Sequence, residues 1–137
     1  MIAGHGIDII EISRIRAAVE KYGDTFLKRI FTPSELEYAK SKKIPYQHLA
    51  ARFAAKEAFA KALGEPDDVG WKEIELVNLE NGKPVFKLSG RAERLKQKNK
   101  VSDVFVSVSH TKYYAVASVL LVRKTQIDAD INADGRR

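Results

Sequence analysis

Residues 52–64 read RFAAKEAFAKALG, and this stretch decides the fold. Alanine, phenylalanine and leucine fill most of it, which predicts a helix that is packed around most of its circumference. Glu57 and Lys61 nevertheless lie inside the stretch, one helical turn apart. Because a charge in apolar surroundings is costly unless something pairs with it, the Glu57 carboxylate needs an explanation.

The spacing of Glu57 and Lys61 is compatible with two interpretations. Side chains four residues apart meet on a helix, so the two could form a partly exposed ion pair worth about 0.3–0.5 kcal/mol. The small alanine side chains around them also allow another chain segment or a ligand to come close, which favours a functional site. The helix alone does not choose between these interpretations.

The composition of the chain indicates one globular domain. Its 137 residues suffice for a single core, and 45% hydrophobic with 31% charged residues is an ordinary globular mixture without a membrane helix. The absence of cysteine excludes disulfides, thiolate nucleophiles and cysteine-bound zinc, and it favours a cytoplasmic location. The net charge of +6 favours an acidic partner, namely nucleic acid, a phosphorylated cofactor or an acidic protein, although simple solvation of the surface also explains it.

The segments before the long helix predict a strand and two shorter helices. Residues 2–10 alternate as a strand, and Ser13 is expected to cap a helix that ends at Gly23. The stretch 32–35 (TPSE) is a capping box with proline at the first helical position, so a second helix should run to about Lys42.

The segments after the long helix predict a mainly antiparallel sheet. Asn81-Gly82 is a strong hairpin signal, and the last two predicted strands alternate with a period of two. The expected fold is therefore α+β, with the sheet packed against the long Ala-rich helix, in one domain over residues 1–123. Residues 124–137 are expected to form a poorly ordered polar tail. The expected elements are the long helix 46–63, strands 71–78 and 84–88, a basic helix 89–100, and strands 103–110 and 113–122.

Asp8 is the second carboxylate of interest, because it lies in a strand that is otherwise apolar. On its own, Asp8 is most simply a strand-end residue bonded to the backbone. Together with Glu57, however, it could hold one hard cation such as Mg²⁺, which prefers a few carboxylates plus water and phosphate oxygens.

Basic residues gather in the sequence around the long helix and offer positive charge on more than one side of it, although some could simply form a solvated rim. The adjacent Ser109 and His110 face opposite sides of a strand, and no nucleophile motif surrounds them. A histidine at a strand end beside Thr111 is more naturally a phosphate contact. The basic group comprises Lys42, Lys43, His48, Arg52, Lys56 and Lys61.

Four segments occur in an order that resembles the holo-acyl-carrier-protein synthases, the short bacterial 4′-phosphopantetheinyl transferases. The resemblance covers residues 1–122, and its most specific part is G-I-D near the N-terminus combined with F-x-x-K-E-A-x-x-K on the helix. The four segments are GIDIIEISRI (6–15), RFAAKEAFAKALG (52–64), NGKP (81–84) and VSVSHT (106–111).

The resemblance implies a specific reaction in fatty acid and lipid synthesis. The 4′-phosphopantetheine group of coenzyme A moves to a serine of apo-acyl carrier protein, adenosine 3′,5′-bisphosphate leaves, and Mg²⁺ is required. It also implies a cytoplasmic homotrimer with active sites between subunits. By the same resemblance, Asp8 and Glu57 are metal ligands and, with Lys61, the catalytic residues. The serine proton could pass to Glu57, to a metal-bound water or to Glu35, and Glu57 is favoured.

The resemblance also assigns the remaining site residues. Contacts to coenzyme A are implied for Lys43, Arg52, Lys61, Asn81, Gly82, Pro84, Ser109, His110 and Thr111. The acidic carrier protein is expected to dock on Arg14, Arg16, Lys21, Lys28 and Arg29, where complementary charge would speed encounter.

Two functions of other classes compete with the transferase. The net charge would also suit a small nucleic-acid-binding module, but the aromatic platforms and basic reading motifs of such modules are missing from the sequence. A structural trimer without catalysis would leave the combination of Asp8 with Glu57 unexplained.

Overall fold

The computed structural model describes residues 1–65 and 69–125 of the chain. In chain order its elements are β1 (Ile2–Glu11), α1 (Ile12–Tyr22), α2 (Asp24–Ile30), α3 (Pro33–Lys40), α4 (Pro45–Leu63), the 3-10 turn η1 (Trp71–Glu73), β2 (Ile74–Asn78), β3 (Pro84–Leu88), α5 (Gly90–Lys98), β4 (Asp103–His110) and β5 (Tyr114–Val122).

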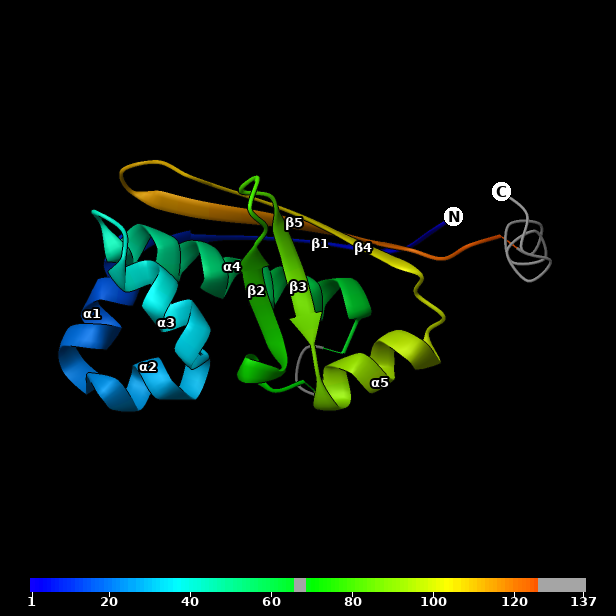
Figure 1. The fold of residues 1–137 in the computed structure, drawn as a ribbon, viewed down its shortest axis with the longest axis horizontal. Coiled ribbons are helices and arrows are strands. Elements are labelled where there is room, and N and C mark those ends of the chain that lie inside the picture. Colours follow the sequence, from blue (N-terminus) through cyan, green and yellow to red (C-terminus); the bar gives the residue numbers. More distant parts are fainter. Residues whose placement is uncertain (66–68, 126–137) are drawn as a thin grey trace.

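The main sheet is antiparallel, with the strand order β1-β5-β4, and β2 and β3 form a separate antiparallel hairpin. Figure 1 shows the three-stranded sheet edge-on, with α4 along one of its faces and the β2–β3 hairpin beside α4. Helices α1, α2 and α3 gather at one end of the molecule, and α5 lies at the other. The prediction of an α+β fold with an antiparallel sheet against the long helix is confirmed.

Helix α4 is buried around most of its circumference, as its alanine content predicts. Ala50, Ala54 and Ala58 are fully buried. The helix ends at Gly64, whose left-handed backbone (φ 78°) suits glycine, as expected from the sequence. The small side chains allow β1 to lie very close to the helix.

The backbone of β1 contacts α4 directly at two glycines. A Cβ atom added at Gly6 would overlap the carbonyl oxygen of Ala58, and one added at Gly4 would overlap that of Ala62. The earlier glycine of β1 meets the later alanine of α4, so β1 runs antiparallel to α4. The spacing is consistent, because two residues along a strand and four along a helix span similar lengths. This close approach determines where Asp8 lies relative to the helix.

A fully buried ion pair joins α3, α4 and β2. The Nζ atom of Lys56 lies 2.7 Å from Oε1 of Glu35, and both side chains are 0% exposed. Lys56 also donates hydrogen bonds to the carbonyl oxygens of Trp71 and Ile74. Burial lowers the pKa of Lys56, and the Glu35 carboxylate opposes this lowering. Lys56 is therefore a structural residue, which its sequence neighbours did not indicate.

Glu35 is not available as the acceptor of the serine proton. Its Oε1 accepts the Thr32 amide, which completes the predicted capping box, and its Oε2 accepts the Leu76 amide. Both carboxylate oxygens are thus engaged inside the core, and the hypothesis that Glu35 is a base is wrong.

Three local expectations need correction. Helix α1 begins at Ile12 without a side-chain cap, because the Ile12 amide donates to the Tyr113 carbonyl and the β1–β5 ladder continues straight into the helix; Ser13 already lies inside it. Residues 24–30, for which the sequence predicted no helix, form α2. The predicted strand 71–78 begins only at Ile74, after the 3-10 turn.

The sheet face turned away from α4 is apolar and exposed. Ile7, Ile9 and Phe105 lie on it and are 57%, 64% and 51% exposed. Among the described residues no element covers this face, and Figure 1 shows it open on the side opposite α4. Within the same residues, no helix is both long and apolar enough for a bilayer. Most of the predicted tail, from residue 126 onward, lies outside the described residues.

Candidate active site

The carboxylate of Asp8 lies where β1 meets α4. Lys61 donates from Nζ to Oδ1 of Asp8 at 3.0 Å and to the carbonyl oxygen of Ile7 at 3.2 Å. The Asp8 and Lys61 side chains are 15% and 50% exposed, so solvent reaches the pair. Glu57 is half-buried one turn before Lys61. Of the three predicted catalytic residues, the structure thus pairs Asp8 with Lys61, and Glu57 precedes Lys61 by one turn of the same helix.

The two carboxylates are a suitable but incomplete set of metal ligands. Over residues 1–65 and 69–125, no three His, Cys, Asp or Glu side chains gather as a cation site. A pair such as Asp8 and Glu57 therefore fits a hard cation that takes its other ligands from water and phosphate. It does not fit a zinc ion held by protein alone.

Arg52 is the centre of a second group of residues, which we call the phosphate cluster and which also contains Tyr38, Lys42, His48, Asn78, His110 and Thr111. Arg52 is only 4% exposed, and one of its terminal nitrogens donates to Oδ1 of Asn78 at 2.8 Å. Its guanidinium lies 4.0 Å from the centroid of the Tyr38 ring. Within the described part of the chain its buried Nε has no hydrogen-bond partner. A buried guanidinium with a donor to spare suits a bound anion.

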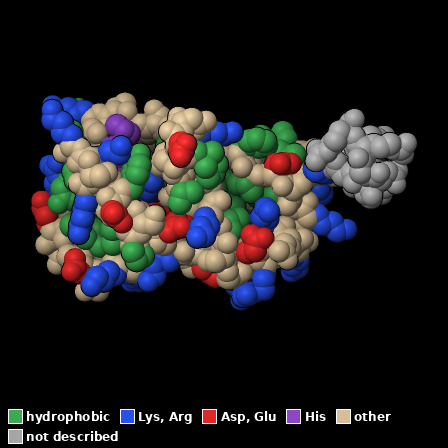
Figure 2. Space-filling view, in the orientation of Figure 1, with side chains coloured by type: hydrophobic (Ala, Val, Ile, Leu, Met, Phe, Trp, Pro, Cys, Tyr) green, Lys and Arg blue, Asp and Glu red, His purple; other side chains and the backbone are tan. Residues whose placement is uncertain are grey.

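Two histidines lie beside Arg52. The His110 ring, at the end of β4, meets the His48 ring edge to face at 5.4 Å between centroids. Gln47 donates from Nε2 to the Thr111 carbonyl at 3.4 Å, which ties the turn after β4 to the start of α4. Figure 2 shows histidine among Lys and Arg side chains at the end of the molecule that contains α1 and α3. The cluster is therefore rich in positive charge and hydrogen-bond donors.

The β2–β3 turn is attached to the phosphate cluster through Asn78. Its Nδ2 donates to the Gly82 carbonyl at 3.0 Å, while its Oδ1 accepts from Arg52. Asn81 accepts the Lys83 amide and shapes the turn, and Pro84 begins β3. The predicted hairpin is thus confirmed, and its tip is placed next to the cluster.

Of the other predicted coenzyme contacts, Ser109 lies apart from this group, and Lys43 directly follows its member Lys42. Ser109 pairs with Val116 on the outer, exposed face of the sheet, whereas the His110 ring reaches the face that carries α4. Lys43 is exposed in the segment between α3 and α4. The structure does not bring the Ser109 side chain together with Arg52 in one chain.

The sequence does not predict Tyr38 or Asn78 as site residues, and it assigns no role in the site to His48. Tyr38 lies one turn after Glu35 on α3, a spacing that places both on one face but does not mark either as a site. Asn78 directly precedes the hairpin, and only its contact with Arg52 reveals its role. These residues can be recognised only from their contacts in the folded structure.

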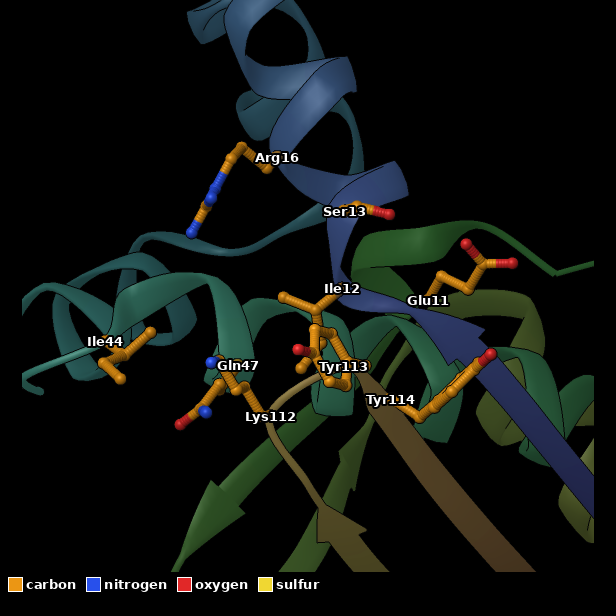
Figure 3. A pocket seen from close by; sticks show the side chains of 9 residues that line it. All are labelled: Glu11, Ile12, Ser13, Arg16, Ile44, Gln47, Lys112, Tyr113 and Tyr114. Carbon is orange, nitrogen blue, oxygen red and sulfur yellow. The ribbon is translucent and has the colours of Figure 1, made fainter.

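The predicted docking residues lie on the exposed faces of α1 and α2. Arg14, Arg16, Lys21, Lys28 and Arg29 are all exposed. A pocket of about 520 Å³ opens between the start of α1, the start of α4 and the β4–β5 turn. Figure 3 shows Arg16 at one side of it, with Gln47 and Lys112 opposite. This pocket links the basic helix face to the turn that follows His110.

The carboxylate pair and the phosphate cluster face different parts of the chain. Asp8 belongs to edge strand β1, whereas Arg52 reaches Asn78 on the separate hairpin. On α4, Arg52 and Glu57 are five residues apart, which is about 140° around the helix. The two groups therefore lie on different sides of α4 within one chain.

Comparison with known proteins identifies the class. A model of the 4′-phosphopantetheinyl transferase superfamily matches residues 4–118, so the chain belongs to this superfamily. The holo-[acyl-carrier-protein] synthase of Geobacter sp. (strain M21) is 49% identical over 125 residues, which is 90% of this chain and 100% of that protein. The corresponding protein of Halothermothrix orenii is 43% identical and is covered over 97% of its length.

Solved structures agree. The crystal structure of holo-[acyl-carrier-protein] synthase from Neisseria meningitidis has a TM-score of 0.83 at 35% identity, covering 90% of this chain and 100% of that one. The Bacillus anthracis enzyme in complex with CoA (3′,5′-ADP) has a TM-score of 0.72 at 40% identity, covering 90% and 99%. The chain is a member of the holo-[acyl-carrier-protein] synthase family, as the sequence motifs predict.

Proposed function

We propose that this chain transfers the 4′-phosphopantetheine group of coenzyme A to a serine of apo-acyl carrier protein, with Asp8, Glu57 and Lys61 as its catalytic residues. The observation that carries this proposal is the close approach of β1 to α4, because it brings Asp8 to Lys61 within one turn of Glu57. The relatives that match over nearly their whole length are named as enzymes of this reaction, and one is seen with CoA (3′,5′-ADP).

The reaction exchanges the phosphoanhydride bond of coenzyme A for a phosphate ester bond to serine. The serine oxygen forms a bond to the phosphorus next to the pantetheine arm, the bond from that phosphorus to the bridging oxygen breaks, and adenosine 3′,5′-bisphosphate leaves with the electron pair. Asp8 and Glu57 would hold Mg²⁺, which supplies Lewis-acid polarisation of the diphosphate when bound. Lys61 is close enough to Asp8 to place its positive charge beside the diphosphate and stabilise the leaving group.

Glu57 is the proposed acceptor of the serine proton, directly or through water. It is half-buried beside the Asp8–Lys61 pair, whereas the alternative carboxylate, Glu35, is enclosed in the core. A base must lie within hydrogen-bond reach of the proton it removes, and only Glu57 of these two lies beside the proposed diphosphate position.

The phosphate cluster is proposed to bind the nucleotide end of coenzyme A. Arg52, His110 and Thr111 would contact phosphate, and the turn containing Asn81, Gly82 and Pro84 would lie along the adenosine, with Lys43 near the rim. The buried Nε of Arg52 and the histidine pair support this assignment. Such charge-assisted bonds position a phosphate more firmly than exposed lysines do.

We also propose a homotrimer in the cytoplasm, with each active site shared by two subunits. The exposed apolar sheet face containing Ile7, Ile9 and Phe105 is the surface proposed to be buried on assembly. Because the two half-sites face different directions in one chain, a neighbouring copy would bring its phosphate cluster to Asp8 and Glu57. Light scattering should give about three times the chain mass of 15.4 kDa.

A charged substitution on the sheet face tests this assembly. Ile9→Glu should give monomers and abolish turnover, because burying an unpaired carboxylate between subunits is costly. Leu79→Glu, on an exposed turn away from the sheet, is the control and should remain a trimer. An active Ile9→Glu monomer would rule out shared sites.

The carrier protein is proposed to dock on the basic face of α1 and α2. Arg14→Ala should raise the KM for the carrier by about fivefold and flatten its salt dependence, because complementary charge mainly speeds encounter. Arg94→Ala removes an exposed arginine from α5, at the opposite end of the molecule, and should leave KM unchanged (Figure 1). Equal effects of the two substitutions would contradict docking on α1.

A direct assay tests the proposed reaction. The protein is incubated with coenzyme A, Mg²⁺ and apo-acyl carrier protein, and the carrier is weighed by mass spectrometry. The carrier should gain the mass of one phosphopantetheine group. If several carriers remain in the apo form, the proposed activity is wrong.

A further inference from the structure

His48 lies at the centre of the phosphate cluster, although it is outside the motifs that mark the family. Its ring meets the Tyr38 ring of α3 edge to face at 5.7 Å and the His110 ring of β4 at 5.4 Å between centroids. Aromatic pairs of this kind are stabilising beyond their buried area. The His48 ring therefore lies between Tyr38 of α3 and the His110 ring.

The charged groups around His48 are cationic on each side. Arg52 follows it by one turn on α4, and its guanidinium covers the Tyr38 ring. Lys42 reaches the same ring, with Nζ at 4.8 Å from the centroid. The titratable and charged groups that face His48 are Tyr38 of α3, Lys42 before α4, Arg52 of α4 and His110 of β4.

These surroundings disfavour a proton on His48 in the free protein. Burial, followed by His110, Arg52 and Lys42, lowers the pKa of His48 below the ordinary imidazole value. The nearby carboxylates Glu35 and Glu75 act on Arg52. A phosphate group bound between Arg52 and His110 would oppose the positive field of His110, Arg52 and Lys42 and so raise the pKa of His48 relative to the free protein.

We propose that His48 is a positioning residue of the phosphate cluster that holds the His110 ring against α4 and takes up one proton from solvent when a phosphate of coenzyme A binds. This inference rests on the proposed binding of coenzyme A at Arg52 and His110. The protonated imidazole adds a positive charge only after the anion has arrived. Coenzyme A affinity therefore rises as the pH falls from 8 to 6, more than the other cationic groups alone would produce.

Two substitutions separate the ring contacts of His48 from its proton. His48→Phe keeps an aromatic ring against Tyr38 and His110 but cannot titrate. His48→Ala loses both properties. Isothermal titration of coenzyme A into each folded variant with Mg²⁺, in two buffers of different ionisation enthalpy, gives both the affinity and the number of protons taken up.

The expected results differ between the variants. His48→Phe should take up fewer protons than the wild type at pH 7 and show a flatter dependence of coenzyme A affinity on pH. His48→Ala should show the same flattening and bind about 3- to 10-fold more weakly at pH 8, because His110 loses its ring contact. Proton uptake by His48→Phe equal to that of the wild type would overturn the proposal.

Arg52→Ala and His110→Ala distinguish this inference from the function on which it rests. If either weakens coenzyme A binding strongly while both His48 variants match the wild type in affinity and proton uptake, the role of His48 is wrong and the phosphate cluster stands. If neither Arg52→Ala nor His110→Ala weakens binding, the phosphate cluster itself is misassigned, and the inference fails with it.

Discussion

Two lysines of the same helix form ion pairs of opposite character. Lys56 meets Glu35 at 2.7 Å, with both side chains 0% exposed, and its ammonium also bonds two backbone carbonyls. Lys61 meets Asp8 at 3.0 Å, with the two side chains 50% and 15% exposed. A buried and fully satisfied pair fixes the packing of its neighbours, whereas an exposed pair contributes little stability and stays accessible to a substrate.

The difference arises from helix geometry. Lys56 and Lys61 are five residues apart, about 140° around α4, so Lys56 faces α3 and β2 while Lys61 faces β1. In the sequence AAKEAFAK (54–61) both lysines follow an alanine, and the local pattern does not distinguish them. Their separate roles follow only from the elements that lie on either side of the helix.

The largest expected effect on folding comes from breaking the buried pair. Lys56→Met should lower the free energy of unfolding by about 3–5 kcal/mol, because Glu35 would remain buried without its partner. Lys61→Met is the matched control and should change it by less than about 1 kcal/mol. Urea denaturation of the two variants checks this. Equal losses would mean that the two pairs do not differ in role.

A smaller effect is expected where β1 contacts α4. Gly6→Ala should cost about 1–3 kcal/mol of stability, because the new Cβ meets the Ala58 carbonyl and the backbone of one element must shift. Since the shift moves Asp8 away from Lys61, turnover should fall as well. Thermal unfolding and a turnover assay measure the two effects. A variant as stable and active as the wild type would show that the close contact does not position Asp8.

The smallest effect concerns pH. The pKa of His48 is lowered in the folded state, so below about pH 6.5 the unfolded chain binds more protons than the folded chain. Stability should therefore decrease as the pH falls from 7.5 to 5.5, and His48→Phe should lose less. Melting temperatures over this range test the prediction. A steeper loss of stability in His48→Phe than in the wild type would mean that folding does not lower the pKa of His48.

The sequence predicted the features that depend on local patterns. The capping box at Thr32, the end of α4 at Gly64 and the hairpin at Gly82 each follow from the chemistry of neighbouring residues, and all are present. Ser13 was misjudged because the start of α1 is determined by a long-range bond from Ile12 to Tyr113. A long-range backbone hydrogen bond of this kind can determine where a helix begins, whatever capping residue is nearby.

The site was predicted in part. Asp8 pairs with Lys61, and Arg52 is linked to His110 through the rings of Tyr38 and His48. Contacts between distant segments explain the rest: Asn78 matters through Arg52, and Lys56 is buried by Glu35 of another helix. No spacing within one segment records such pairings, so the basic residues around α4 could not be divided into structural and functional ones.

The most direct test of the proposed active site compares the mass gained by apo-acyl carrier protein with the wild type and with Glu57→Gln, with the melting temperature measured on the same samples. Glu57→Gln keeps the size of the side chain and removes its charge. This variant should transfer no phosphopantetheine, and its melting temperature should lie within about 2 °C of the wild type, because the substitution keeps the size of the side chain and removes only the carboxylate. Transfer at a rate near that of the wild type would contradict the assignment of the active site to the line where β1 meets α4.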